Sequence, residues 1–181
     1  MPVFSARDVH RTLHSTLQAC LVAQGLRSTK RSITAWTRLE PLPLTLWFQC
    51  DKYGWDALWG SRFTMEMQLG EPLDPGAGSF SNRARYWHLL TSEERGVFHA
   101  KGNEIIARLP GSLQDAAVSV KDDSGEEIVV LGYKPTSSPP PSGADFWMNY
   151  FTESDVEAWA HLLQGVLVPL MARFEAARGE A

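Results

Sequence analysis

Four of the five histidines fall into two pairs that could support metal binding or acid–base chemistry. His10 and His14 lie one helical turn apart, but neither the glutamate of a His-Glu-x-x-His motif nor a nearby third ligand accompanies them. We therefore interpret this pair as surface histidines. His88 and His99 flank two glutamates and could act as acid and base in a cleft. We prefer the interpretation of a solvated helix face, and we predict no metal and no cofactor.

Nucleophilic catalysis has one candidate thiol. Cys50 ends a segment that alternates with period two, on the side that carries apolar residues, so we expect it to be buried. The sequence contains no Gly-x-Ser-x-Gly elbow, and Cys50 lies in no catalytic cysteine motif. The glycines at 70, 76 and 78 are not spaced as in a phosphate-binding loop, and no lysine followed by serine or threonine comes after them. These motifs do not decide whether the protein is an enzyme, but we favour the interpretation that it is not.

Basic side chains gather in two segments that should meet one end of a predicted sheet: Arg27, Lys30, Arg31, Arg83 and Arg85. Basic residues after a helix are also explained by the helix macrodipole. A cationic sheet end could nevertheless bind an anion or an acidic partner. If His88 and the turn at 50–60 join this end, the site would suit a small hydrolase or a binder of small molecules or anions.

Aromatic side chains gather in the segment "CDKYGWDALWG", residues 50–60, which contains Tyr53, Trp55 and Trp59. They could form a ligand-binding cage. Because alternating segments precede and follow them, we prefer a long link between two strands, with a tryptophan folded back over the sheet end. A capping tryptophan would be buried against the core, whereas a ligand-binding one would line an open pocket.

The elements that must position these residues begin with a helix. Ser5 is a plausible N-cap, and Gly25 supplies a stop. Between them an apolar stripe recurs at helical spacing, at Val9, Leu13, Leu17, Cys20 and Leu21.

Three strands should follow the first helix as an antiparallel meander, within residues 32–40, 44–51 and 62–70. In the last of these, Phe63, Met65 and Met67 point inward. Pairing Leu39 with Leu44 across the proline turn would place Trp36 opposite Trp47, both facing away from the core. Either a second layer such as residues 145–150 covers these two tryptophans, which we prefer, or they form a patch for a protein partner.

The second half of the chain changes period. After a loop at 71–82, we predict a helix capped by Ser92, which its glycines could break into two, and a hairpin within 116–133. The apolar stripe of that helix comprises Val97, Ile105, Ile106 and Leu109. Residues 134–143 are rich in proline and serine and predict an extended internal connection. A short aromatic strand and a long helix opened by Thr152 complete the chain.

Composition bounds the remaining possibilities. The 181 residues, 44% of them hydrophobic, suit one domain, and the net charge of −4 gives no electrostatic reason to expect nucleic acid or an anionic membrane. The two cysteines are too few for a disulfide framework, and we find neither a signal peptide nor a membrane-spanning stretch. We therefore expect a cytoplasmic protein.

The order of helix, meander and basic aromatic segment "RARYWHLL" resembles a bacterial family of unknown function. The matching residues, within roughly the first 90, are Phe63, Thr64, Leu69, Gly70, Arg85 and Trp87. The resemblance implies no activity, catalytic residue or cofactor.

Taken together, the sequence predicts a single α+β domain, with a sheet of about five antiparallel strands packed on the first and last helices. For function, we expect a non-enzymatic interaction protein, including one of the immunity type, that binds a protein partner through its aromatic face or loops. The alternative is the small hydrolase or anion binder described above. The oligomeric state is left open.

Overall fold

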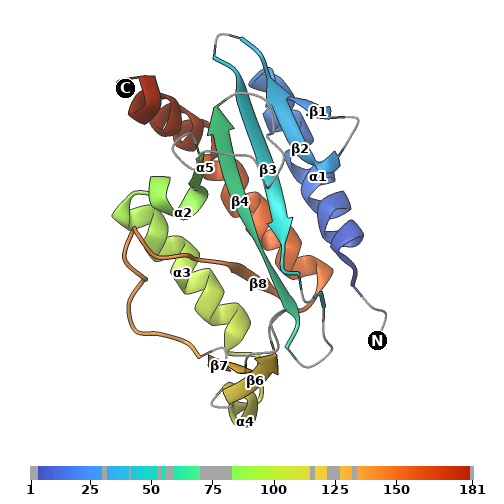
Figure 1. The fold of residues 1–181 in the computed structure, drawn as a ribbon, viewed down its shortest axis with the longest axis vertical. Coiled ribbons are helices and arrows are strands. Elements are labelled where there is room, and N and C mark those ends of the chain that lie inside the picture. Colours follow the sequence, from blue (N-terminus) through green and yellow to red (C-terminus); the bar gives the residue numbers. More distant parts are fainter. Residues whose placement is uncertain are drawn as a thin grey trace.

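An antiparallel sheet packs against helices in the computed structural model, which describes residues 4–29, 32–40, 42–52, 54–55, 59–69, 83–114, 117–121, 127–131 and 134–179 (Figure 1). The sheet order is β1 (Arg27–Thr29), β2 (Ser32–Arg38), β3 (Leu44–Cys50), β4 (Ser61–Leu69) and β5 (Arg83–Arg85), and β8 (Met148–Tyr150) also pairs with β4. The helices are α1 (Ala6–Ala23), α2 (Tyr86–Leu89), α3 (Ser92–Ile106), α4 (Gly111–Gln114) and α5 (Glu153–Gly179). The predicted α+β fold, with its first and last helices on the sheet, is confirmed.

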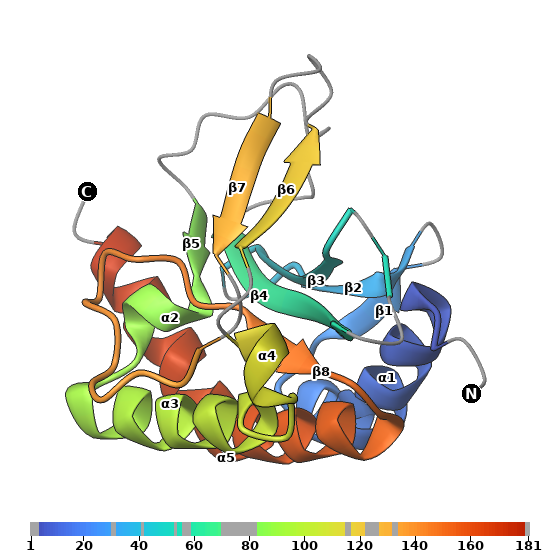
Figure 2. The ribbon, with the colours of Figure 1, turned by 90° about the horizontal axis from the view of Figure 1, so that it is seen from below.

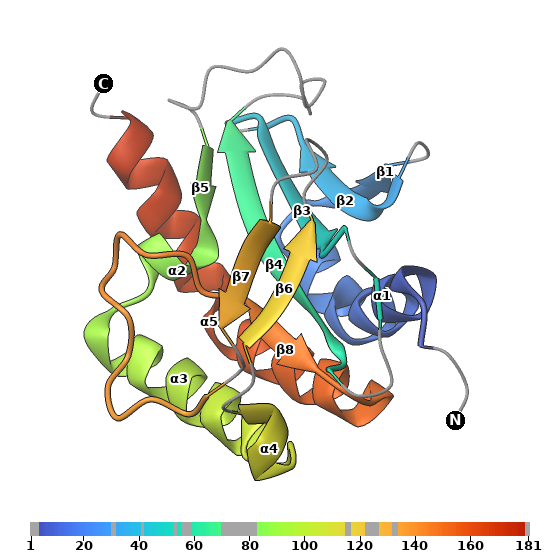
Figure 3. The same cartoon turned by 60° about the horizontal axis from the view of Figure 1, so that its bottom comes forward.

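The two faces of the sheet have different neighbours. Helices α1, α3 and α5 lie on one side, and the hairpin of β6 (Ala117–Lys121) and β7 (Glu127–Leu131) lies on the other (Figures 2 and 3). We call the helix-covered side the helix face. The opposite side is the outer face, formed by Ala35, Trp47, Thr64, Glu66, Gln68, Arg83, Arg85, Trp147 and Asn149.

Helix α1 forms as its sequence predicts. The Ser5 hydroxyl accepts a hydrogen bond from the Asp8 amide, and the Asp8 carboxylate accepts one from the Ser5 amide, which completes a capping box. Gly25 ends the helix with a φ of 77°, a conformation that glycine adopts without steric cost. The buried stripe of α1 packs against β2 and α5 and begins the hydrophobic core.

The predicted register of the first hairpin is wrong by one residue. Trp36 pairs with Leu46 rather than with Trp47, so it lies on the helix face and is only 1% exposed. The same register leaves the Leu39 side chain 65% exposed to solvent. A one-residue shift exchanges the two faces of a strand, and burying one indole removes more apolar surface from water than burying a leucine.

The alternation of β4 is confirmed, but its outer row is not solvated. Phe63, Met65 and Met67 are fully buried on the helix face. Their outward-pointing neighbours Thr64 and Glu66 are buried as well. Both faces of β4 are therefore enclosed, and the polar groups of the outer row need partners within the protein.

The segment after β5 differs from the prediction in three respects. Thr91, not Ser92, caps α3, because its hydroxyl accepts the hydrogen bond from the Glu94 amide. The chain breaks between α2 and α3, whereas α3 continues through its two glycines. Val97 is half exposed, although the helical stripe placed it inside.

The short strands β1 and β5 were not predicted.

The C-terminal third follows the prediction more closely. The 117–131 hairpin is present, while its turn and the 71–82 loop lie outside the described residues. In the first turn of α5, the Asp155 carboxylate accepts hydrogen bonds from the amides of Phe151 and Thr152, which precede the helix, each at 2.9 Å. Within the part of the chain that the structure describes, no helix is long and apolar enough to cross a membrane.

The corrected register predicts how two substitutions in β2 and its following turn affect stability. Trp36→Ala should lower the free energy of unfolding by about 3–5 kcal/mol, because it opens a cavity in the core. Leu39→Ala should change it by less than about 0.5 kcal/mol, because the side chain is exposed. Urea denaturation followed by circular dichroism measures both. Equal small losses would restore the register that places Trp36 outside.

Candidate functional site

One edge of β4 is shared by two short strands. Residues Ser61 to Phe63 pair with β8, and Glu66 to Gln68 pair with β5. Both strands run antiparallel to β4, so they lie end to end along it, and Thr64 and Met65 fall between them. At this junction the chain leaves β5 for α2, and residues 134–147, which we call the strap, lead into β8. We call the junction the split edge.

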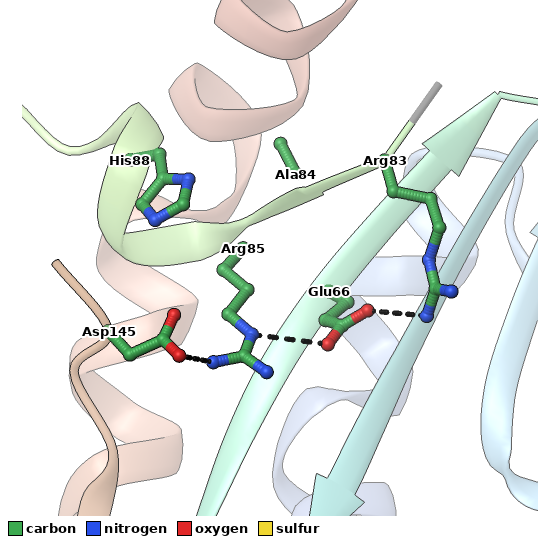
Figure 4. A pocket seen from close by; sticks show the side chains of 6 residues that line it. All are labelled: Glu66, Arg83, Ala84, Arg85, His88 and Asp145. Atoms are coloured by element: carbon green, nitrogen blue, oxygen red, sulfur yellow. Dashed lines mark hydrogen bonds and ion pairs between the residues drawn. The ribbon is translucent and has the colours of Figure 1, made fainter. Parts of the chain in front are cut away.

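A pocket of about 350 Å³ lies at the split edge (Figure 4). Glu66 of β4 and the two arginines of β5 come from neighbouring strands, His88 comes from α2, and Asp145 comes from the strap. Among the residues that the structure describes, the lining comprises Glu66, Arg83, Ala84, Arg85, His88 and Asp145. The volume falls in the range that small ligands occupy in proteins.

Glu66 is the buried centre of this site. It is only 6% exposed, and each of its oxygens faces a guanidinium. Arg83 Nη2 donates to Oε2 at 2.7 Å, and Arg85 Nε donates to Oε1 at 3.3 Å. Cross-strand pairing places Glu66 directly opposite Arg85 and diagonally across from Arg83, which pairs with Gln68. The two guanidinium partners offset the hydration that this carboxylate loses on burial.

The guanidinium groups of the two β5 arginines lie over tryptophan rings of the outer face. The Arg83 guanidinium lies 4.7 Å from the ring centre of Trp47. Arg85 and Arg62 share the ring of Trp147, at 5.3 and 5.1 Å. These distances are within the range of cation–π attraction. The arginines are therefore fixed both by a carboxylate and by aromatic rings.

Asp145 closes the far side of the pocket. Its carboxylate forms an ion pair with Arg85 Nη1, although the Asp145 side chain is 56% exposed. Arg85 thus extends from the buried Glu66 to a carboxylate at the surface, as Figure 4 shows. His88 is exposed beside it. A guanidinium that already holds one surface carboxylate has the geometry to hold the carboxylate or phosphate of a ligand.

The structure brings together three of the residues singled out in the sequence, namely Arg83, Arg85 and His88. Arg27 lies in the same row across the sheet as Arg83, but β1 and β5 are separated by three strands. Arg27 is therefore not part of the pocket. Lys30 and Arg31 lie outside the described residues.

The two described tryptophans of the 50–60 segment do not line this pocket. Trp55 is half-buried, packs against the core, and its indole nitrogen donates to the Phe151 carbonyl at 3.3 Å. Trp59 is also half-buried, and Tyr53 lies outside the described residues. The link precedes the β8 end of β4, whereas the pocket lies at the β5 end. Trp55 therefore caps the sheet, as the preferred interpretation of the segment expected.

Trp36 and Trp47 have separate roles. Trp36 belongs to the core, where His14 stacks on its ring with centres 5.4 Å apart. Trp47 faces outward as predicted and is half-buried beneath Arg83. The residues that sequence reasoning missed are Glu66 and Asp145.

The closest thiol–imidazole contact is unsuited to catalysis. Cys50 Sγ lies 3.6 Å from Nε2 of His10. Burial lowers the pKa of His10 to about 4, and burial together with the Asp51 carboxylate raises the pKa of Cys50 to about 12. Both groups are therefore neutral near pH 7, whereas a nucleophilic cysteine needs to be a thiolate. The prediction of surface histidines is wrong for His10, which is buried, whereas His14 is half-buried against Trp36.

His99 is likewise buried rather than solvated, so the prediction for its helix face is wrong at this residue. Its Nε2 lies 2.7 Å from the Thr136 hydroxyl at the start of the strap. Across the described ranges, no group of three or more histidine, cysteine, aspartate or glutamate side chains is placed to hold a metal ion.

Comparison of the chain with family models, curated proteins and solved structures found no match. The resemblance of the first 90 residues to a bacterial family therefore stays a prediction, and the pocket itself must carry the functional argument.

The charge cluster predicts a stability loss when its centre is neutralised. Glu66→Gln should lower the free energy of unfolding by about 2–3 kcal/mol, because two partly buried arginines lose their shared counter-charge. Glu104→Gln is the matched control, since that glutamate is 66% exposed and pairs only at the surface, with Lys101. Urea denaturation measures both variants. Equal effects would contradict a buried, paired Glu66.

The buried imidazole of His10 predicts an acid-sensitive stability. Because its folded pKa lies below the unfolded value, the unfolded chain binds more protons between about pH 6.5 and 4. The stability that the neutral His10 side chain contributes to the folded protein is fully present above that pH window, and it is lost as the pH falls through the window. The wild-type protein should lose about 1–2 kcal/mol more than His10→Gln between pH 7 and 5. His161→Gln, at an exposed histidine, should behave as wild type.

Proposed function

We propose that the protein is a binding protein that recognises a carboxylate or phosphate group of its ligand in the pocket at the split edge. One observation carries this proposal: Arg85, fixed between Glu66 and Trp147, already holds the surface carboxylate of Asp145. A guanidinium presents planar paired donors that match the oxygens of carboxylates and phosphates. Holding the arginine in place reduces the entropy lost on binding.

The chemistry of the pocket favours binding over hydrolysis. Its described lining residues offer guanidinium, carboxylate and imidazole groups, but neither a hydroxyl nor a thiol side chain. Cys50 projects from the helix face, away from the outer-face pocket, and is a half-buried, neutral thiol. His88 can add a donor to a bound anion.

The anionic group has two possible sources, a small molecule or an acidic side chain of a protein partner. The partner hypothesis first rested on exposed tryptophans, and the burial of Trp36 removes part of that support. Asp145 supplies another argument, because a carboxylate carried by a polypeptide segment already reaches Arg85.

We also propose a cytoplasmic location, consistent with the free thiols of Cys20 and Cys50, and no role in nucleic-acid binding.

Calorimetry with a matched pair of arginine variants tests this proposal. Inorganic phosphate, citrate and a short acidic peptide are the probes, and the peptide with its acidic residues replaced by amides is the control ligand. Arg85→Gln should weaken binding of whichever anion binds by at least about tenfold, because a charge-assisted hydrogen bond is lost.

Arg62→Gln is the matched control. It lies over the same Trp147 ring but pairs with Asp51 outside the pocket, at 2.5 Å. Its affinity should stay within about threefold of wild type, because it makes no contact with the bound anion. If none of the three anions binds, or if both variants weaken binding equally, the pocket is not the anion site. Binding of the acidic peptide but not of the small anions would assign the ligand to a protein partner.

A further inference from the structure

We infer that Asp145 is an internal occupant of the anion site, which an incoming anion displaces, so that ligand binding releases the strap turn at residues 142–145. The inference rests on the proposed function and adds a regulatory contact to the same pocket. It follows from how the strap is attached on either side of Asp145.

The strap is held firmly before this turn. The side-chain amide of Asn103 donates to the Thr136 carbonyl at 2.7 Å, and the Thr136 amide donates to Asn103 Oδ1 at 3.1 Å. His99 contacts the Thr136 hydroxyl. Further along, the Trp87 indole nitrogen donates to the Pro141 carbonyl at 3.0 Å. Residues 136–141 are thus tied to α3 and α2.

The strap is held again directly after Asp145. The ring of Phe146 stacks on Trp87 with centres 4.3 Å apart and lies edge-on to Trp159. It also fits over Gly102, where an added Cβ would lie 3.1 Å from the Phe146 ring. These contacts are apolar and do not depend on the ion pair of Asp145.

Between these two attachments the turn is exposed. The Ala144 amide donates to the Pro141 carbonyl at 3.0 Å, which closes the turn on itself. The ion pair with Arg85 is the tie from Asp145 to β5. The Asp145 side chain can therefore leave Arg85 without breaking the attachments at Pro141 or Phe146.

The energetic balance suits a displaceable contact. A half-exposed carboxylate gains only modestly from its ion pair, so a ligand can replace it. While it is closed, however, the tethered Asp145 reduces the fraction of protein that can bind an anion, and the apparent affinity falls by that fraction. Because coupling is reciprocal, a bound anion must favour the open turn to the same extent.

Removing the charge of Asp145 tests the inference. Asp145→Asn should raise the affinity for inorganic phosphate by about threefold to tenfold in calorimetry. Glu104→Gln, which removes a similarly exposed carboxylate from α3, should leave the affinity unchanged. Asp145→Ala should match Asp145→Asn, which separates loss of charge from a new amide contact.

Hydrogen exchange provides a second readout. In the wild-type protein, saturating phosphate should speed exchange in residues 142–145 but not at the tied segment around Thr136. Arg85→Gln should speed the same exchange without ligand, because the tie itself is lost. Circular dichroism checks that each variant is folded.

The outcomes separate the inference from the proposed function. If phosphate binds through Arg85 but Asp145→Asn changes neither affinity nor exchange, Asp145 is not an occupant and the binding proposal stands. If phosphate binds Asp145→Asn and not the wild type, both are supported. If no probe binds the wild type or Asp145→Asn, both are overturned.

Discussion

A buried carboxylate on β4, an inner strand, constrains the whole outer face of the sheet. Burying the Glu66 carboxylate removes it from water, and β5 supplies two guanidinium partners for it from one short strand. Those arginines in turn need support over their planar faces, which Trp47 and Trp147 provide. The polar side of the sheet is thereby organised as specifically as the apolar side, and the pocket is a consequence of this arrangement.

The periodicity of the chain was sufficient to predict α1, the alternation of β4 and the 117–131 hairpin, because each is a local pattern. It did not decide the β2–β3 register, since the apolar residues of β2 are divided between both faces, and only the packing of Trp36 against α1 selects one. The pairing of β5 and β8 with one edge of β4 is a long-range choice that no local pattern encodes.

The same distinction explains the candidate site. Arg83, Arg85 and His88 are close in the sequence and could be grouped before the fold was known. Glu66 looked like an ordinary solvent-facing residue, and Asp145 looked like part of an aromatic segment, because their partners lie across separate connections. His10 carried a signal that was overlooked: it lies seven residues before Leu17, on a helical row that is buried.

The split edge also bears on whether a foreign strand can add to the sheet. A nine-residue strand such as β4, if its edge were free, would offer its unpaired backbone groups to a second chain and would invite aggregation. Here two strands of three residues each, one carrying two charged arginines, cover that edge. The sheet ends on its other side in β1, which is equally short. The residues that form the pocket therefore also limit the backbone available for adding foreign strands.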